Sequence, residues 1–210
     1  MTTKAIAALG FAPHSGWAAV VGVGEADGHL HVLVRERIEM VDPRAPEWKQ
    51  PYHAAEGLPI VEAAERLAAC AATAELMARQ AIRRIVGQLA RRGHRAAGLG
   101  ILESAGRKGA ALADILASHA LIHAADGEHF RSAIAGAADR CGLTAFRVRG
   151  RELEAKAAAA LGRPAETLRL VLKGVGRDMG PPWAADQKAA ALLAWLVLAK
   201  VSKEGRRTRG

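Results

Sequence analysis

Residues 5–21 read AIAALGFAPHSGWAAVV, and this stretch predicts how the chain begins to fold. An apolar run leads into a segment with Pro13 and Gly16, residues that favour tight turns, and a second apolar run begins at Trp17. Two strands are therefore expected to run back along each other. A third strand is predicted over 29–38, because polar and apolar residues alternate there after a Gly-containing turn. Three sequential antiparallel strands thus open the domain.

The rest of the chain alternates between helix and strand patterns. The run 96–104 is nearly all apolar, which is typical of a central strand buried on both faces. The fold class is therefore α/β, with a mixed five-stranded sheet of three antiparallel and then parallel strands, flanked by helices. The later elements are expected to be a helix over 60–92, a strand over 96–104, a helical region over 112–141 that Gly127 could interrupt, and a strand over 144–148. A short helix over 151–161, a helix or strand over 167–173 and a final helix from about Trp183 follow.

Length and composition limit the classes of protein to which the chain can belong. It has 210 residues, half of them hydrophobic, which predicts one domain over 1–203 followed by a disordered basic tail over 204–210. The last apolar run, 189–199, is shorter than the roughly 20 residues of a membrane span. Two cysteines without metal spacing, and no signal-peptide pattern at the start, favour a reduced protein of the cytoplasm.

The charge indicates the kind of partner. The formal net charge of +9 favours a polyanion such as nucleic acid, whereas the aromatic content of 4% argues against single-strand binding by base stacking. Two Gly-containing basic segments, over 105–110 and 173–182, are expected to be loops. The candidate contacts to nucleic-acid phosphates are Arg107, Lys108, Lys173 and Arg177.

A second candidate site lies in the helical region 112–141. His119, His123 and Asp126 stand at i, i+4 and i+7, so they project from one side of a helix and could bind a metal ion. The alternative, which is the commoner arrangement, is a set of hydrogen-bonded histidines at the edge of the core. The proline-rich segment 41–59 is predicted to be a loop that either covers a site or packs as an extended arm.

Four stretches resemble the RuvC-like resolvase branch of the ribonuclease H-like superfamily. Residues 10–17, GFAPHSGW, resemble the opening turn of that branch, and 99–103 resembles its strand ending in a catalytic glutamate, here Glu103. Residues 134–148 resemble a helix, glycine and strand of the family. Asp186, before an Ala/Leu-rich helix, resembles an acid of its closing helix.

The resemblance implies a nuclease centre in which three or four carboxylates hold two Mg²⁺ or Mn²⁺ ions that hydrolyse a phosphodiester. Glu103 and Asp186 match two of these acids. Ala12 stands where the family has its opening aspartate, and Trp183 stands where it has a further acid. If Asp186 is instead matched to the earlier acid of the closing helix, Ala189 stands at the later one. The acidic motif is therefore degraded, although His14 and other histidines could rebuild a single-metal site.

Three hypotheses for the function follow. The first is a catalytically degenerate RuvC-like domain that binds branched or structured nucleic acid or a protein partner, as a homodimer if it follows the family. The second is an active metal-dependent endonuclease with a site remodelled around Glu103, Asp186 and His14. The third is a non-enzymatic regulatory or structural protein with a small-molecule groove near His119, His123 and Asp126.

Overall fold

The computed structural model describes residues 4–103 and 109–207 and contains one five-stranded sheet. Its strands are β1 (Ala5–His14), β2 (Trp17–Ala26), β3 (His29–Glu39), β4 (His94–Glu103) and β5 (Ala145–Arg149). The spatial order is β3-β2-β1-β4-β5. The pairs β1/β2 and β2/β3 are antiparallel, whereas β1/β4 and β4/β5 are parallel. The predicted fold class is confirmed.

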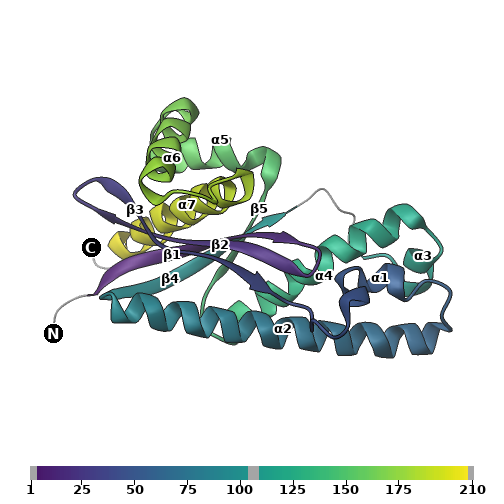
Figure 1. The fold of residues 1–210 in the computed structure, drawn as a ribbon. Coiled ribbons are helices and arrows are strands. Elements are labelled where there is room, and N and C mark those ends of the chain that lie inside the picture. The colour runs from purple at the N-terminus through teal and green to yellow at the C-terminus, as the bar shows by residue number, and fades with distance from the viewer. Residues whose placement is uncertain (1–3, 104–108, 208–210) are drawn as a thin grey trace.

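Helices cover both faces of this sheet (Figure 1). The long helix α2 and helix α4 lie on one face, and α5, α6 and α7 gather on the other. Two short helices, η1 and α1, precede α2, and α3 precedes α4. The bounds are η1 Pro46–Lys49, α1 Pro51–Ala54, α2 Ile60–Arg91, α3 Leu112–Leu116, α4 His119–Asp139, α5 Gly150–Leu161, α6 Ala165–Met179 and α7 Ala185–Arg207.

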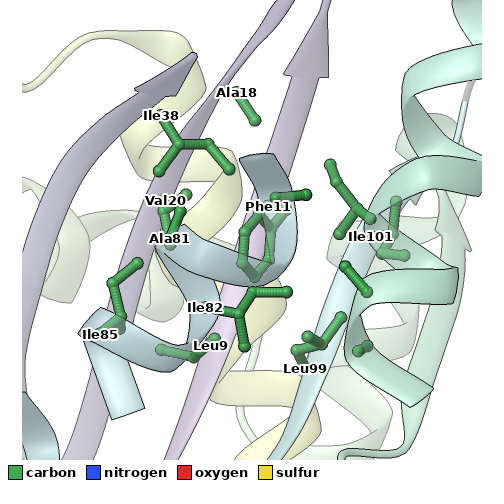
Figure 2. Packing of buried hydrophobic residues seen from close by; sticks show 14 of the residues in the cluster. Leu9, Phe11, Ala18, Val20, Ile38, Ala81, Ile82, Ile85, Leu99 and Ile101 are labelled. Atoms are coloured by element: carbon green, nitrogen blue, oxygen red, sulfur yellow. The ribbon is translucent and has the colours of Figure 1, made fainter. Parts of the chain in front are cut away.

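The two-residue period of β1 divides the core into two layers. Leu9 and Phe11 point toward α2, where they meet residues such as Ile82 (Figure 2). Ala8 and Ala12 point the other way, into the cluster that α7 completes. The buried side chains at positions 7–9, 11 and 12 of β1 are therefore divided between the α2/α4 layer and the α7 layer.

Helix α7 packs unusually close to the sheet because glycines face it. A Cβ atom on Gly10 would lie 2.0 Å from the Ala190 carbonyl oxygen, and one on Gly100 would lie 2.4 Å from Cγ of Leu193. The contact of Ala190 with Gly10 places the first turn of α7 beside the carboxyl end of β1. Asp186 belongs to that first turn.

The segment 173–182 differs from its prediction as a loop. Helix α6 continues to Met179, because Leu168 and Leu172 are buried against the α7 layer. The Arg35 guanidinium then donates hydrogen bonds to the carbonyls of Gly180 and Pro182, at 2.7 and 3.0 Å, which fixes the short connection to α7. Lys173 and Arg177 are therefore helical residues.

Three other boundaries also differ from the sequence-based expectations. The interruption of the second helical region falls before His119, where Ser118 is extended, and α4 continues through Gly127. The proline-rich segment 41–59 contains η1 and α1 rather than loop alone. Helix α7 reaches Arg207, within the segment expected to be a disordered tail, and Lys203 donates a hydrogen bond to the Ala160 carbonyl at 2.7 Å. Among the described residues, no helix is long and apolar enough to cross a membrane.

Candidate functional site

The carboxyl edge of the sheet brings together two of the predicted site residues. His14 ends β1, and its Nε2 lies 3.1 Å from Oδ2 of Asp186 in the first turn of α7. The His14 ring also stacks on Trp17, with centroids 4.3 Å apart, and the Arg37 guanidinium carbon lies 4.0 Å from the centre of the Trp17 ring. The partner of the Asp186 carboxylate here is thus an imidazole of the same chain.

Glu103 lies at the same edge but on the other face of the sheet. It shares the orientation of Leu99 and Ile101, which belong to the α2/α4 layer. Its Oε1 lies 3.3 Å from Arg147 Nη1, which also lies 2.6 Å from Glu128 Oε1 on α4. Burial opposes the charge of Arg147, but hydrogen bonds to Glu128 and Glu103 outweigh it and raise the pKa of the guanidinium. Glu103 is therefore held beside a stabilised cation.

Ala12 and Trp183, the two residues expected to stand in place of acids, are both packed against other parts of the chain. Ala12 is 2% exposed and lies in the α7 layer, opposite Ala19 of β2. Trp183 precedes α7, and its indole Nε1 donates a 2.8 Å hydrogen bond to the Leu172 carbonyl. A Cβ atom on Gly176 would lie 2.0 Å from the Trp183 ring, so the indole presses directly on α6. Trp183 docks α7 on α6 and supplies no carboxylate.

A basic groove of about 680 Å³ opens between α5, α6 and the start of α7. Its charged lining consists of four cations and one acid, Glu154, whose Oε2 lies 2.8 Å from Arg169 Nη1. The groove begins at Gly150, where an added Cβ would lie 3.9 Å from the Glu103 carbonyl oxygen. It therefore adjoins the carboxyl end of β4. The four cations are Arg151, Arg169, Lys173 and Lys188.

The predicted nucleic-acid contacts fall in different places. Lys173 lines the basic groove, and Arg177 is exposed one turn later on α6. Arg107 and Lys108 lie outside the described residues. Sequence reasoning missed Arg151, Arg169 and Lys188, which reach the groove from three separate helices.

The second candidate site is a histidine cluster made by His53, His119 and His123. Within 4–103 and 109–207, it is the single group of three or more histidine, cysteine or carboxylate residues whose ligand atoms lie within 4.8 Å of one another. The Nε2 atoms of His119 and His123 are 3.0 Å apart. The ring of His53 contacts both, with centroids 5.3 Å from His119 and 4.5 Å from His123.

Asp126 stands behind this cluster. Its carboxylate is 5% exposed, and Oδ2 lies 2.5 Å from Nδ1 of His53. Oδ1 accepts a 2.7 Å hydrogen bond from the backbone N–H of Tyr52. The structure therefore brings His119 and His123 together as predicted, adds His53 from the proline-rich segment, and gives Asp126 the role of orienting His53.

A fourth histidine, His129, is buried on the same helix. Its ring meets Phe130 and Tyr52 edge-on, with centroids 5.1 and 6.2 Å away. Burial lowers the pKa of the His129 imidazole, against smaller opposing effects of the Asp126 carboxylate and the Cys70 carbonyl. The buried surroundings of His129 therefore favour its neutral form.

Replacement of His129 by leucine is expected to flatten the pH dependence of stability. In the unfolded chain, His129 takes up a proton as pH falls below about 6.5, whereas in the folded chain burial opposes that protonation. Acidification therefore shifts the equilibrium toward the unfolded state. Urea unfolding of wild type and His129→Leu between about pH 5 and pH 8 measures this. The stability of the variant relative to wild type should rise as pH falls. A difference that stays constant would contradict the prediction.

Comparisons with known proteins agree with this architecture. No family model and no curated protein sequence matches the chain. Solved structures do match, among them Thermus thermophilus RuvC in complex with a Holliday junction substrate and a further structure of Thermus thermophilus RuvC. The first has a TM-score of 0.51 at 13% identity, over 94% of this chain and 96% of RuvC. The second has a TM-score of 0.52 at 13% identity, over 95% and 97%. The chain thus has a RuvC-like, ribonuclease H-like fold.

Proposed function

We propose that this chain is a degenerate RuvC-like domain that binds branched or structured nucleic acid without cleaving it through a two-metal carboxylate centre. The observation that carries the proposal is the basic groove beside an edge of the sheet where the remaining acids are paired with cationic or imidazole groups. One of the RuvC structures of the same fold was solved with a Holliday junction substrate, which guides the choice of ligand for testing.

The arrangement of the acids supports the loss of the metal centre. A two-metal site needs several carboxylates converging on one point. Here Asp186 lies on the α7 side with His14, and Glu103 lies on the α4 side with Arg147. The place of the opening aspartate is occupied by Ala12 inside the α7 layer of the core. Two carboxylates on opposite faces provide a poor site for two divalent ions.

The groove supports binding of a polyanion. Its cations come from three helices around a concave surface. Arg169 pairs with Glu154 at 2.8 Å, and Arg151 lies 3.9 Å from Glu152. Lys173 and Lys188 are exposed on facing helices. Such a concave arrangement concentrates positive potential and suits a phosphate backbone, whose binding releases counterions.

Replacement of both groove lysines is expected to weaken junction binding about tenfold at roughly 100 mM NaCl. Loss of two phosphate contacts should also reduce the slope of log K against log salt by about 2. Fluorescence anisotropy of a labelled four-way DNA junction, titrated with wild type and Lys173→Ala/Lys188→Ala over a salt series, measures both quantities. A duplex with the same arm sequence shows whether branching matters.

A variant with the same loss of charge serves as the control. Arg83 and Arg91 are exposed on α2, on the other face of the sheet, so Arg83→Ala/Arg91→Ala should keep junction affinity within about twofold. Equal losses of junction affinity in both double variants would show that the junction does not bind at the groove. Wild-type affinity too weak to measure, or affinity independent of salt, would overturn the nucleic-acid function.

The active endonuclease hypothesis is tested with the same junction. Wild type is incubated with Mg²⁺, Mn²⁺ or Zn²⁺, and strand cleavage is followed on denaturing gels. No cleavage above background is expected, because Asp186 and Glu103 do not share a face. Cleavage that Glu103→Gln or Asp186→Asn abolishes would instead establish the remodelled nuclease site.

A further inference from the structure

The histidine cluster carries an inference separate from the nucleic-acid function. We propose that His53, His119 and His123 bind one Zn²⁺ ion, with Asp126 as the carboxylate that orients His53. Two ligands come from successive turns of α4, and the third comes from α1, which lies beside the start of α4 (Figure 1).

The distances fit a single small ion. Nitrogens that each lie 2.0–2.1 Å from a tetrahedral ion are about 3.3 Å apart. The Nε2 atoms of His119 and His123 lie 3.0 Å apart, and the ligand atoms of all three residues lie within 4.8 Å of one another. The i, i+4 spacing on α4 fixes His119 and His123 in advance.

The buried carboxylate is independent evidence for a built site. A histidine that binds a metal commonly donates its other ring N–H to a carboxylate, which fixes the tautomer and increases the basicity of the ligand. Asp126 accepts such a hydrogen bond from Nδ1 of His53 at 2.5 Å, so Nε2 of His53 is the nitrogen left for the ion. The backbone N–H of Tyr52 holds the second carboxylate oxygen at 2.7 Å. The half-buried ligand is thus oriented by a residue that is itself almost fully buried.

The ligand set selects the class of metal. Three imidazoles suit Zn²⁺ and its neighbours in the first transition row, whereas Mg²⁺ prefers oxygen ligands and keeps several waters. His119 and His123 are exposed, so a fourth position remains open to water or to an oxygen ligand from solvent. His53 lies on α1 and the other two histidines lie on α4, whereas Asp186 lies on α7 across the sheet, so this site is distinct from the family's acidic centre.

The test is metal binding by the full chain after chelation and dialysis. Calorimetric titration with ZnCl₂ should give one ion per chain, and Co²⁺ should give the visible absorption bands of a low-coordinate nitrogen site. His123→Ala should weaken Zn²⁺ binding at least about 100-fold, since one of three ligands is lost. Asp126→Asn keeps all three ligands and should weaken binding by about 10- to 100-fold. A large excess of Mg²⁺ should leave the Zn²⁺ titration unchanged.

Two matched controls separate this site from alternatives. His29→Ala/His31→Ala removes two exposed imidazoles from β3, and Glu103→Gln/Asp186→Asn neutralises the acids at the sheet edge; both should keep Zn²⁺ affinity within about twofold. His123 is exposed, so circular dichroism should show that its variant keeps the wild-type fold. Wild type that binds no Zn²⁺, or His123→Ala that binds it as tightly as wild type, would overturn the proposal. Neither result depends on nucleic-acid binding.

Discussion

Replacement of Gly10 by alanine is expected to lower the free energy of unfolding by about 3–5 kcal/mol, a large effect for one methyl group. The added Cβ would lie 2.0 Å from the Ala190 carbonyl oxygen and 2.8 Å from the Ala194 nitrogen. Both are backbone atoms of α7, so no side-chain rotation can relieve the clash. The whole helix must move away from β1, and the α7 layer of the core loses its close packing.

The control for this prediction is a glycine with free space around it. Gly87 lies within α2, and the nearest atom to an added Cβ is Arg91 Nη1 at 3.6 Å. Gly87→Ala should therefore stabilise the protein by about 0.5–1 kcal/mol, because alanine restricts the unfolded chain and favours helix. Chemical unfolding of both variants measures the difference. A Gly10→Ala variant as stable as wild type would show that α7 does not pack on β1 in this way.

Periodicity predicted the sheet correctly because each strand has a clear physical signature. The alternating run 29–38, the turn at Gly16 and the all-apolar run 96–104 required only local reasoning, and β3, the β1–β2 hairpin and β4 lie there. The face of the sheet on which Glu103 lies was harder to predict from the sequence. A strand buried on both faces is apolar throughout, so its pattern does not say which face a terminal residue joins.

The wrong prediction of a loop over 173–179 has a tertiary cause. The segment 173–179 contains Gly174 and Gly176, which are turn signals, but the burial of Leu168 and Leu172 and the Trp183 indole against Gly176 make it helical. Tertiary packing here overrides local propensity.

The histidine cluster was only half predictable. The spacing of His119 and His123 on one helix is visible in the sequence, whereas His53 lies 73 residues before Asp126. It reaches α4 only because the short helix α1 packs there. No local pattern encodes that contact. The one indication in the sequence that His53 could belong to a site was its place in the long proline-rich segment 41–59, since long segments of this kind are often functional.

Introduction of an acid at the end of β1, by Ala12→Asp, is expected to destabilise the protein by roughly 3–5 kcal/mol at neutral pH without creating a metal site. Ala12 is 2% exposed among the residues that pack against α7, so the introduced carboxylate would be buried in an apolar layer. Burial favours the protonated form of a carboxyl group. The loss of stability should therefore be smaller near pH 4 than near pH 8, because the folded variant holds its proton at pH values where the unfolded chain has released it.

Ala12→Asn is the matched control, since it adds a side chain of nearly the same size without the charge. The difference between the free energies of unfolding of the two variants, measured in urea, then gives the free-energy cost of burying the charged carboxylate. Addition of millimolar Mg²⁺ or Mn²⁺ is expected to leave that difference unchanged. Asp186 is paired with His14, and Glu103 lies with Arg147 on the opposite face, so the introduced acid would have too few partners to hold an ion.

The opposite result would change the interpretation of the whole sheet edge. If Mn²⁺ recovered the stability of Ala12→Asp but not of Ala12→Asn, the introduced carboxylate would be binding metal together with Asp186 or Glu103. Junction cleavage by the same variant would then show that one substitution separates this chain from a working nuclease. If neither appears, Asp186 and Glu103 are stabilised at this edge by His14 and Arg147 of the chain itself, and an added carboxylate does not recruit a metal ion.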